Sequence, residues 1–254
     1  MKNIILLLLF ACTLSYAKAQ KGDTLILSSE NILVKNLPLG QHRYLIYFKK
    51  DKDSSSISFQ LWNLNVKRET YKGKPAIVVD QLWEDNSEII HKVHSVNDAR
   101  DFKPLFQSSW WKTRGTILTD FEEKTATFPD QLFRKNIDSS RKVAHDAFLK
   151  AANTYALNWH LDLETFSLLP FKQGRTFGIN YYDAGFSEPK IQYYTVTGSA
   201  LFTGPDQHQT DCWLLRHESP NNIETFWISK KTNEVLKLEQ QFGKMYRYKI
   251  KIPY

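Results

Sequence analysis

Cysteine is scarce in this sequence, with only Cys12 and Cys212 among 254 residues. We expect the segment that contains Cys12 to be removed, which excludes a disulfide bond within the mature chain. The run Asp211–Leu215 is typical of a buried strand, so a packed thiol is predicted at Cys212 rather than a reactive one. A chain of this length without disulfides must bury a large core, and its 42% hydrophobic content provides one.

Long apolar runs are also rare. The longest, Ile4–Leu14, is shorter than the about 20 residues that a spanning helix requires, and no later run approaches it. It follows Lys2 and precedes Ala17-Lys18-Ala19, which is the order of a secretory signal peptide. We therefore predict a signal peptide over residues 1–19, cleaved after Ala19, and a periplasmic or secreted protein.

A second processing site lies within the same segment. Leu9-Phe10-Ala11-Cys12 loosely resembles a lipoprotein box, in which the cysteine is lipidated after cleavage. Phe10 is bulky for its place in such a box, and the Ala-x-Ala sequence downstream is a good cleavage site. Cleavage after Ala19 is therefore favoured over lipidation at Cys12.

The sequence has no strong excess of charge of either sign. Its formal net charge is +7, and removal of Lys2 and Lys18 with the signal peptide lowers this to +5. The basic residues are diluted by acids in Lys49–Asp53 and by apolar residues in Arg247–Lys251, which favours a solvated surface. Contact with a membrane surface stays open, whereas export argues against a nucleic-acid partner.

Motifs for catalysis and for cofactors are absent as well. The sequence has no G-x-S-x-G elbow, no Gly-rich phosphate loop, and no Cys pair or HExxH spacing for zinc. His91 and His94 lie in a strand-like run, where an offset of three places the two rings on opposite faces. The sequence thus predicts no metal and no cofactor, and it favours a protein that is not an enzyme.

A hydrolase assembled from residues distant in sequence stays open as an alternative. Its candidate groups are His145, His160 and His217 with nearby carboxylates, and Asp162 and Glu164 are compatible with acid–base chemistry. Two neighbouring acids are, however, more often part of a solvated face. Convergence of these groups in an open cleft is the observation that favours a hydrolase.

What the sequence does contain is a series of short β-prone runs separated by polar turns, which is typical of an antiparallel sheet. The expected strands are 42–49, 57–69, 75–84, 88–96, 105–112, 116–121, 191–202, 213–217, 225–229, 234–241 and 245–252. In the last of them, Tyr246, Tyr248 and Ile250 alternate with Arg247 and Lys249. This alternation predicts a sheet that is covered on one side and wet on the other.

The period changes in an insertion at about residues 138–168. Asp138–Ser140 is expected to cap a helix that runs to about Thr154, with apolar residues at helical spacing. A second short helix is expected over Leu161–Leu168, ending before Pro170. No linker rich in Pro, Gly or Ser divides the chain. We predict one mainly β (α+β) domain over residues 20–254, a curved antiparallel sheet or incomplete barrel with one or two covering helices.

Aromatic residues are abundant, with 16 Phe, 12 Tyr and 7 Trp. For each tryptophan, burial in the core of a broad sheet is the simpler interpretation. A strongly curved sheet also leaves a cavity lined by aromatic side chains, which suits an acyl chain or another apolar ligand. The candidate ligand-binding residues are Trp62, Trp83, Trp111, Trp213 and Trp227.

Three short stretches carry a resemblance to a family of uncharacterised periplasmic proteins. Val93–Leu105 resembles their strand, turn and x-Pro-Leu step, Leu168–Gly174 their Leu-Pro-x-x-x-Gly step, and Glu224–Lys237 their closing hairpin. The resemblance spans residues 40–254. It implies an incomplete antiparallel barrel similar to the lipoprotein localisation carriers, which hold acyl chains in an apolar groove beneath covering helices.

We therefore expect an extracytoplasmic, non-enzymatic protein that binds a lipid, a lipoprotein or another apolar ligand in the concave face of a curved sheet. An extracytoplasmic hydrolase and a structural module that contacts another envelope protein are the alternatives. A cavity of at least about 300 Å³ distinguishes ligand binding from a purely structural role.

Overall fold

The computed structural model describes residues 22–133, 135–204 and 207–252. The predicted signal peptide over residues 1–19, with both Ala19 and Cys12, lies outside these residues, so its processing stays a prediction. In the described ranges, no helix has both the length and the apolar character needed to cross a membrane.

Fifteen strands form one continuous curved sheet in the order β1-β10-β11-β12-β13-β14-β15-β2-β3-β4-β5-β6-β7-β8, with β9 paired to β10. In chain order they are β1 (Thr24–Ile26), β2 (Gly40–Lys49), β3 (Ser56–Tyr71), β4 (Lys74–Asp85), β5 (Glu88–Asp98), β6 (Pro104–Trp111), β7 (Gly115–Asp120), β8 (Thr125–Thr127), β9 (Leu157–Asn158), β10 (Thr176–Tyr182), β11 (Lys190–Thr203), β12 (Gln209–Ser219), β13 (Asn222–Ser229), β14 (Val235–Phe242) and β15 (Met245–Ile252). Neighbours are antiparallel except that β10 pairs parallel with both β1 and β9.

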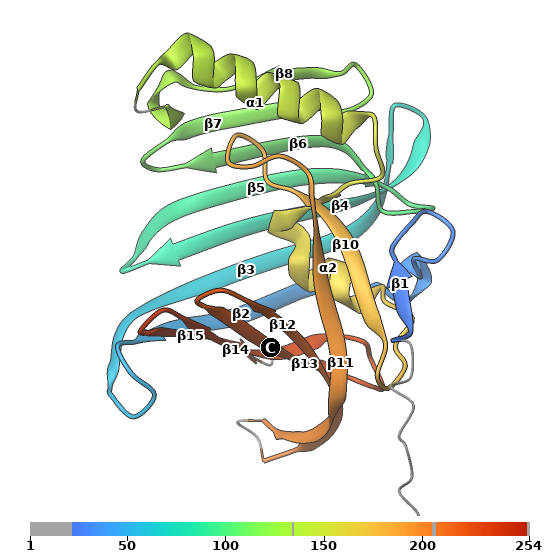
Figure 1. Ribbon diagram of the computed structural model, residues 1–254, viewed down its shortest axis with the longest axis vertical. Coiled ribbons are helices and arrows are strands. Elements are labelled where there is room, and N and C mark those ends of the chain that lie inside the picture. The colour runs from blue at the N-terminus through green and yellow to red at the C-terminus, as the bar shows by residue number, and fades with distance from the viewer. Residues whose placement is uncertain (1–21, 134, 205–206, 253–254) are drawn as a thin grey trace, which may run out of the picture.

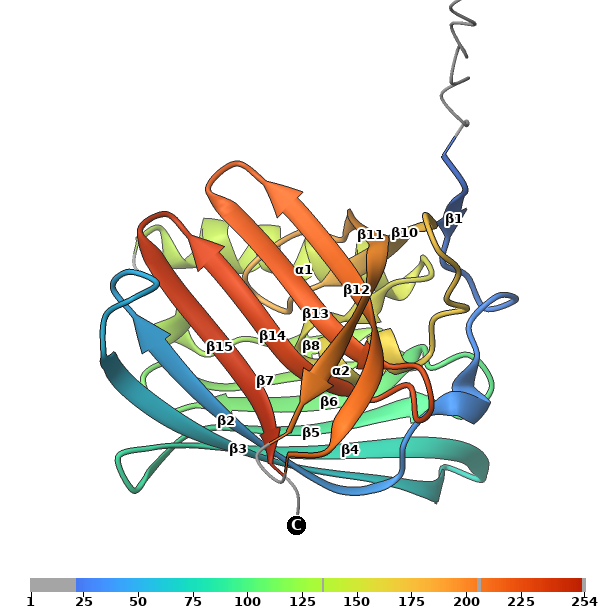
Figure 2. The ribbon, with the colours of Figure 1, turned by 90° about the horizontal axis from the view of Figure 1, so that it is seen from below.

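The sheet curls on itself without closing. In Figure 1 the C-terminal strands lie below β4–β8, and Figure 2 shows β12–β15 passing in front of the β4–β7 strands. Among the described residues, the end strands β1 and β8 do not pair with each other. The prediction of a mainly β protein built on an incomplete barrel is thereby confirmed.

Two α-helices cover different parts of the inner face. Helix α2 (Asp162–Ser167) lies in the concavity between the two halves of the sheet (Figure 1), where the Phe166 ring packs 4.8 Å from Tyr194 and 4.7 Å from Phe226. Helix α1 (Ile137–Ala152) packs its alanines and Phe148 against Ile117 at the β7 end. Short 3₁₀ helices span Val34–Asn36 (η1), Asp130–Leu132 (η2) and Trp159–Leu161 (η3).

The first helix begins differently from the prediction. Asn136, in the left-handed region with φ +48°, precedes the first turn, and Asp138 lies inside that turn instead of capping it. The Ser140 hydroxyl donates to the carbonyl oxygen of Lys135. The helix therefore starts at Ile137, before the Ser and Asp residues that its sequence offers as caps.

The last strand corrects a second prediction. Its alternation is present, but the charged side faces inward: Lys249 is paired with Ile46 and Leu238, both fully buried on the inner face. Its side chain is only 3% exposed. The expectation that the charges of Arg247–Lys251 form a solvated surface is wrong, because α2 covers this side of the sheet and supplies Asp162 as a partner. Cys212, in contrast, is buried and unbridged as predicted.

The loop after β10 offers a test of packing at the sheet end. Gly185 has φ +79°, and a Cβ there lies 2.5 Å from Leu132 Cδ2 and 3.3 Å from Phe128 Cδ1, whereas Gly174 with φ +77° has open space. We expect Gly185→Ala to lower the free energy of unfolding by about 2–5 kcal/mol, from backbone strain and overpacking together. Gly174→Ala, which adds strain alone, should cost about 1–2 kcal/mol. Urea denaturation compares them, and equal losses would contradict this packing.

Candidate functional site

A row of aromatic side chains crosses the inner face of the sheet. Directly opposite partners are Tyr44 and Trp62, Trp62 and Trp83, Trp83 and His91, and His91 and Trp111. Opposite residues of an antiparallel pair share a face, so strands β2–β6 contribute one ring each to a continuous aromatic ladder. Within the ladder, the Trp62 and Trp83 rings stack at 3.6 Å and the His91 and Trp111 rings at 3.7 Å.

His160 on η3 covers the far end of this aromatic ladder. Its ring centre lies 5.0 Å from that of His91 and 6.0 Å from that of Trp111. Its Nε2 atom is 3.5 Å from Oδ1 of Asp183, and the side-chain amide of Gln81 donates to its carbonyl oxygen at 2.9 Å. Burial, with a smaller contribution from His160, lowers the pKa of His91 to about 3, so the His91 ring is neutral near pH 7.

Buried charges lie at the other end of the ladder, beside Trp62. The Lys249 ammonium is 3.2 Å from Oδ2 of Asp162 and 4.5 Å above the centre of the Trp62 ring. Burial lowers the pKa of Lys249, and the Asp162 carboxylate opposes that effect. A charge in such a place is tolerated only with a close partner, so the ion pair joins α2 to β15 directly over the aromatic ladder.

Further ionisable groups surround this ion pair. The side-chain amide of Gln240 donates to Glu224 at 2.8 Å. Burial raises the pKa of Glu224 and lowers that of Arg247, and each of these two groups counters the shift in the other. Burial also raises the pKa of Glu164, on α2, to about 8, which leaves its carboxyl group mostly protonated at neutral pH. We call Asp162, Glu164, Glu224, Arg247 and Lys249 the charge cluster.

Several buried polar atoms along the ladder and the charge cluster have no hydrogen-bond partner among the described residues. They include His91 Nε2, Trp111 Nε1, Glu164 Oε2, Gln240 Oε1 and Arg247 Nε. Buried polar groups in proteins are nearly always hydrogen-bonded. These exceptions to that rule gather on the inner face of the sheet.

A cavity of about 380 Å³ adjoins the end of the ladder. Trp159, Tyr181, Asp183 and Gln192 are among the residues that line it. Tyr181 is buried, and its ring lies 5.0 Å from that of Trp159 in an edge-to-face contact. Because Asp183 contacts both this cavity and His160, the cavity and the aromatic ladder meet at one side chain.

The structure brings three of the five predicted tryptophans together. Trp62, Trp83 and Trp111 belong to the aromatic ladder, whereas Trp213 lies elsewhere, stacked 6.2 Å from Phe171. Trp227 is cross-strand to Leu214 on the outer face, and the Lys237 ammonium lies 4.7 Å from its ring centre. Ligand binding by any of these residues stays a prediction.

The predicted histidines are dispersed. His91 is buried on the inner face, while His94 is exposed on the outer face with its Nδ1 atom 2.7 Å from Asp80, as the strand offset predicts. His145 lies on α1. His217 is buried directly cross-strand to Glu224 of the charge cluster, and its Nδ1 atom is 2.9 Å from the carbonyl oxygen of Tyr193. Within the described ranges, no group of three or more His, Cys, Asp or Glu is placed to hold a metal ion.

Sequence reasoning named Asp162 and Glu164 as candidates but missed the other members of the charge cluster, and it missed the place of His91 and His160 beside the tryptophans. The charged residues of β15 had a visible signal in their strict alternation with Tyr and Ile, which assigns them to one common face. Nothing in that pattern indicates that α2 covers this face.

Comparison with other proteins places the fold in a limited context. A protein-family model matches residues 43–251, a range that includes the aromatic ladder and the charge cluster. The crystal structure of a beta-barrel-like protein of the DUF1849 domain of unknown function from Brucella abortus is similar with a TM-score of 0.34 and 8% identity, covering 85% of this chain and 97% of that one. No curated protein matches the sequence significantly.

The raised pKa of Glu164 predicts a pH dependence of stability. The unfolded chain releases the Glu164 proton near the ordinary value of 4.5 and the folded chain near 8, so stability falls as the pH rises through this window. The slope from one such group is at most about 1.4 kcal/mol per pH unit. We expect Glu164→Gln to lessen the loss of stability between pH 5 and 8, measured by urea denaturation. A slope unchanged from the wild type would show that this carboxyl ionises freely.

Proposed function

We propose that this chain, which belongs to the family described as "Protein of unknown function (DUF3108)", is a non-enzymatic protein. It binds a lipid, a lipoprotein or another apolar ligand on the inner face of its half-barrel. The observation that carries the proposal is the aromatic ladder with its adjoining cavity. The proposed location is outside the cytoplasm, on the strength of the predicted signal peptide over residues 1–19.

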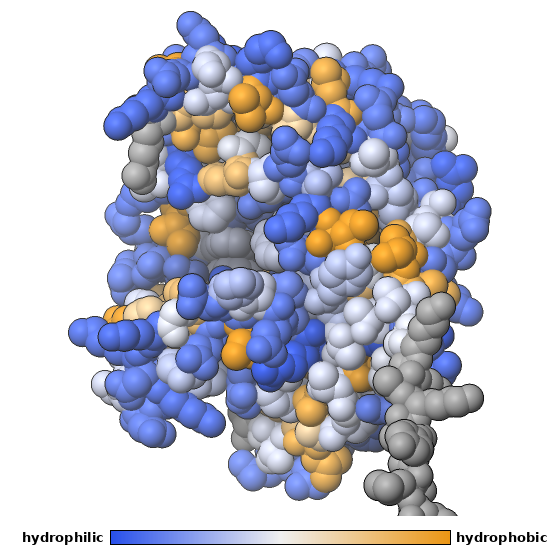
Figure 3. Space-filling model, viewed as in Figure 1, coloured by the Kyte–Doolittle hydropathy of each residue, from blue (hydrophilic) through white to orange (hydrophobic). Residues whose placement is uncertain are grey.

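The accessible end of the aromatic ladder supports this function. Trp83 and Trp111 are only half-buried, and Figure 3 shows the surface hollowed on the concave side, between the two halves of the molecule. Arg114 lies 5.7 Å from the Trp111 ring and 4.7 Å from that of Phe186, which itself is exposed. Large aromatic rings that remain partly exposed at a concave site offer apolar contact area to a ligand.

The cavity volume favours binding over a structural role. At about 380 Å³, the cavity beside Asp183 falls within the range of small-molecule sites, which begins near about 300 Å³. It lies beside His160, where the aromatic ladder ends, and Asp183 is part of its lining. This arrangement fits the groove that the resemblance to lipoprotein carriers implies.

The alternative function, a hydrolase, rests on two approaches of a histidine to a carboxylate: His217 lies directly cross-strand to Glu224, and His160 lies near Asp183. His160 Nε2 lies 3.5 Å from Oδ1 of Asp183, which is longer than the hydrogen bond between a general base and its orienting carboxylate. A nucleophile is the missing part, because in the described ranges no Ser, Thr or Cys side chain is hydrogen-bonded to the His160 ring. The aromatic surroundings of His160 therefore favour binding over acyl transfer.

Co-purification tests the proposed function directly. The mature protein is purified from the envelope of its own cells, extracted, and analysed by lipid mass spectrometry. We expect a co-purifying lipid at near-molar ratio, reduced about tenfold or more in Trp111→Ala, because burying a large aromatic side chain contributes about 1.5–3 kcal/mol.

Trp110→Ala is the matched control for this experiment. Trp110 is the neighbour of Trp111 on β6, but it faces the outer surface with Lys92 near its ring. It should retain the wild-type amount of lipid. Absence of lipid from the wild-type protein, or equal loss in the two folded variants, would contradict binding at the inner face.

A further inference from the structure

The outer face of strands β2–β7 carries a second organised surface, which the inner-face function does not use. Cross-strand pairing aligns two adjacent rows of side chains on it. One row consists of Arg43, Asn63, Leu82, Lys92, Trp110 and Thr116. The other consists of Gln41, Asn65, Asp80, His94 and Ser108. We call the surface formed by these two rows the outer trough.

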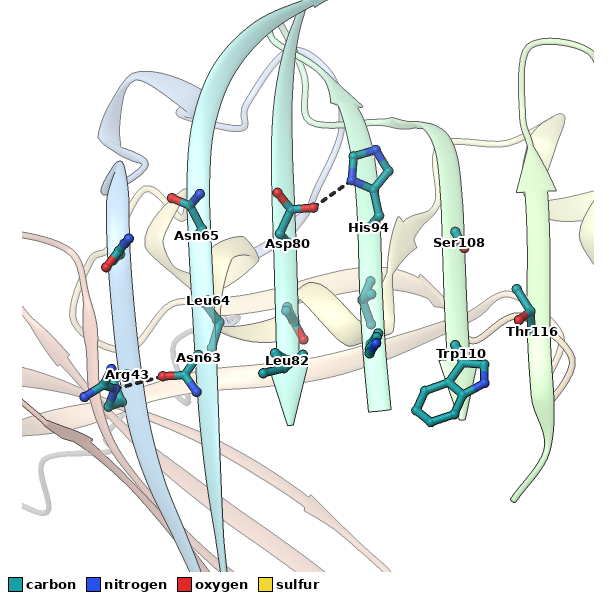
Figure 4. Close-up of a pocket in the computed structure, with 14 residues that line it drawn as sticks. Arg43, Asn63, Leu64, Asn65, Asp80, Leu82, His94, Ser108, Trp110 and Thr116 are labelled. Atoms are coloured by element: carbon teal, nitrogen blue, oxygen red, sulfur yellow. Dashed lines mark hydrogen bonds and ion pairs between the residues drawn. The ribbon is translucent and has the colours of Figure 1, made fainter. Parts of the chain in front are cut away.

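The outer trough is a real depression and not a flat sheet face. Its cavity measures about 610 Å³, inside the range of small-molecule binding sites. Figure 4 shows short side chains, such as Asn63 and Asn65 on β3, between Arg43 on β2 and the Trp110 ring on β6. Adjacent strands are about 4.8 Å apart, so four spacings give the trough a length of about 19 Å between those two walls.

Some hydrogen-bonding groups of the outer trough are engaged with each other, as Arg43 is with Asn63 and His94 with Asp80, while others have no partner among the described residues. The side chains of Gln41, Asn65 and Ser108 make no hydrogen bond to another described residue, nor does the indole N–H of Trp110. An amide side chain both donates and accepts, and a hydroxyl does the same. The trough therefore presents mixed donors and acceptors along its floor.

The charges of the outer trough limit the class of ligand. Arg43 and Lys92 bring two positive charges, and Asp80 brings one negative charge, whose carboxylate contacts His94 at 2.7 Å. Two separated cations beside an acid do not form the basic stripe that a phosphate backbone requires. The polar floor also disfavours an acyl chain, because a buried acyl chain would leave the amides without partners.

A sugar chain matches each of these features. Its hydroxyl groups both donate and accept hydrogen bonds, as the amides of the floor do, and its ring presents C–H groups that pack on an aromatic face. Trp110 offers that face; Lys92 is its neighbour in the row, with the ammonium 5.6 Å from the ring centre, and Leu82 lies one strand further on. We propose that the outer trough binds an oligosaccharide, independently of the ligand on the inner face.

A glycan array, followed by titration calorimetry, tests this second site. The fluorescently labelled mature protein is applied to an array that includes chitotetraose, cellotetraose and tetragalacturonate, and the strongest glycan is then titrated. We expect binding to at least one of these glycans. Trp110→Ala should weaken it about tenfold or more, which corresponds to about 1.4 kcal/mol. Asn65→Leu, which replaces a floor amide by an apolar group of similar size, should weaken it by a similar factor.

Trp227→Ala is the matched control for the outer trough. Trp227 is also an outer-face tryptophan beside a lysine, but it lies on β13, away from the trough. Its removal should leave the affinity within about twofold of the wild type. The proposal would be overturned if no arrayed glycan binds, or if Trp110→Ala and Trp227→Ala change the affinity equally. If Trp110→Ala does not fold, the affinity of Asn65→Leu is compared with that of Trp227→Ala instead. The amount of lipid that co-purifies does not depend on whether a glycan binds to the outer trough. The lipid proposal and the oligosaccharide proposal can therefore fail independently of each other.

Discussion

Lys249 and Asp162 meet inside the half-barrel, where the Lys249 side chain is almost fully buried and that of Asp162 is partly exposed. Transfer of a charged side chain to such a site costs several kcal/mol, which a close partner of opposite charge has to offset. The partners come from β15 and α2, which are separated by much of the chain. Their contact therefore fixes α2 over the sheet, and the Trp62 ring beneath the ammonium joins the ion pair to the aromatic ladder.

The position of α2 gives the two faces of the same strands different chemistry. The inner face is divided among the helix, the charge cluster and the aromatic ladder, while the outer face of β2–β7 has no covering helix in the described chain (Figure 1). Adjacent residues on β6 illustrate the result: Trp111 stacks on His91 inside, and Trp110 forms a wall of the outer trough. One residue step along a strand thus separates an apolar site from a polar one.

Much of the fold was predictable because alternation along a strand is a local property. The strand at Met245–Ile252 was placed correctly, yet its buried side was inverted, because a period of two shows which residues share a face and not which face is inside. Strand β10 was missed, since Gly178 and Asn180 weaken its β-prone pattern and its position depends on pairing with β1 and β11. Tertiary contacts decide both outcomes.

The candidate sites depend still more on contacts distant in sequence. Tryptophan content pointed to Trp62, Trp83 and Trp111, but the participation of His91 follows only from the register of β4, β5 and β6. The outer trough arises from the alignment of six strands, which no single run of sequence reveals. In the sequence, the polar residues of the outer trough look like those of any solvated strand face. Only the strand register shows that they align in two rows.

A double-mutant cycle of Lys249→Met and Asp162→Asn tests most directly whether this ion pair holds α2 against the sheet. The free energy of unfolding of each variant is measured by urea denaturation. Asp162→Asn leaves the buried Lys249 ammonium without its charged partner and should lose about 3–5 kcal/mol. Lys249→Met leaves a partly exposed carboxylate and should lose less. The double variant should lose at least about 2 kcal/mol less than the sum of the two single losses. Additivity within about 0.5 kcal/mol would contradict a direct role of this ion pair in holding the helix.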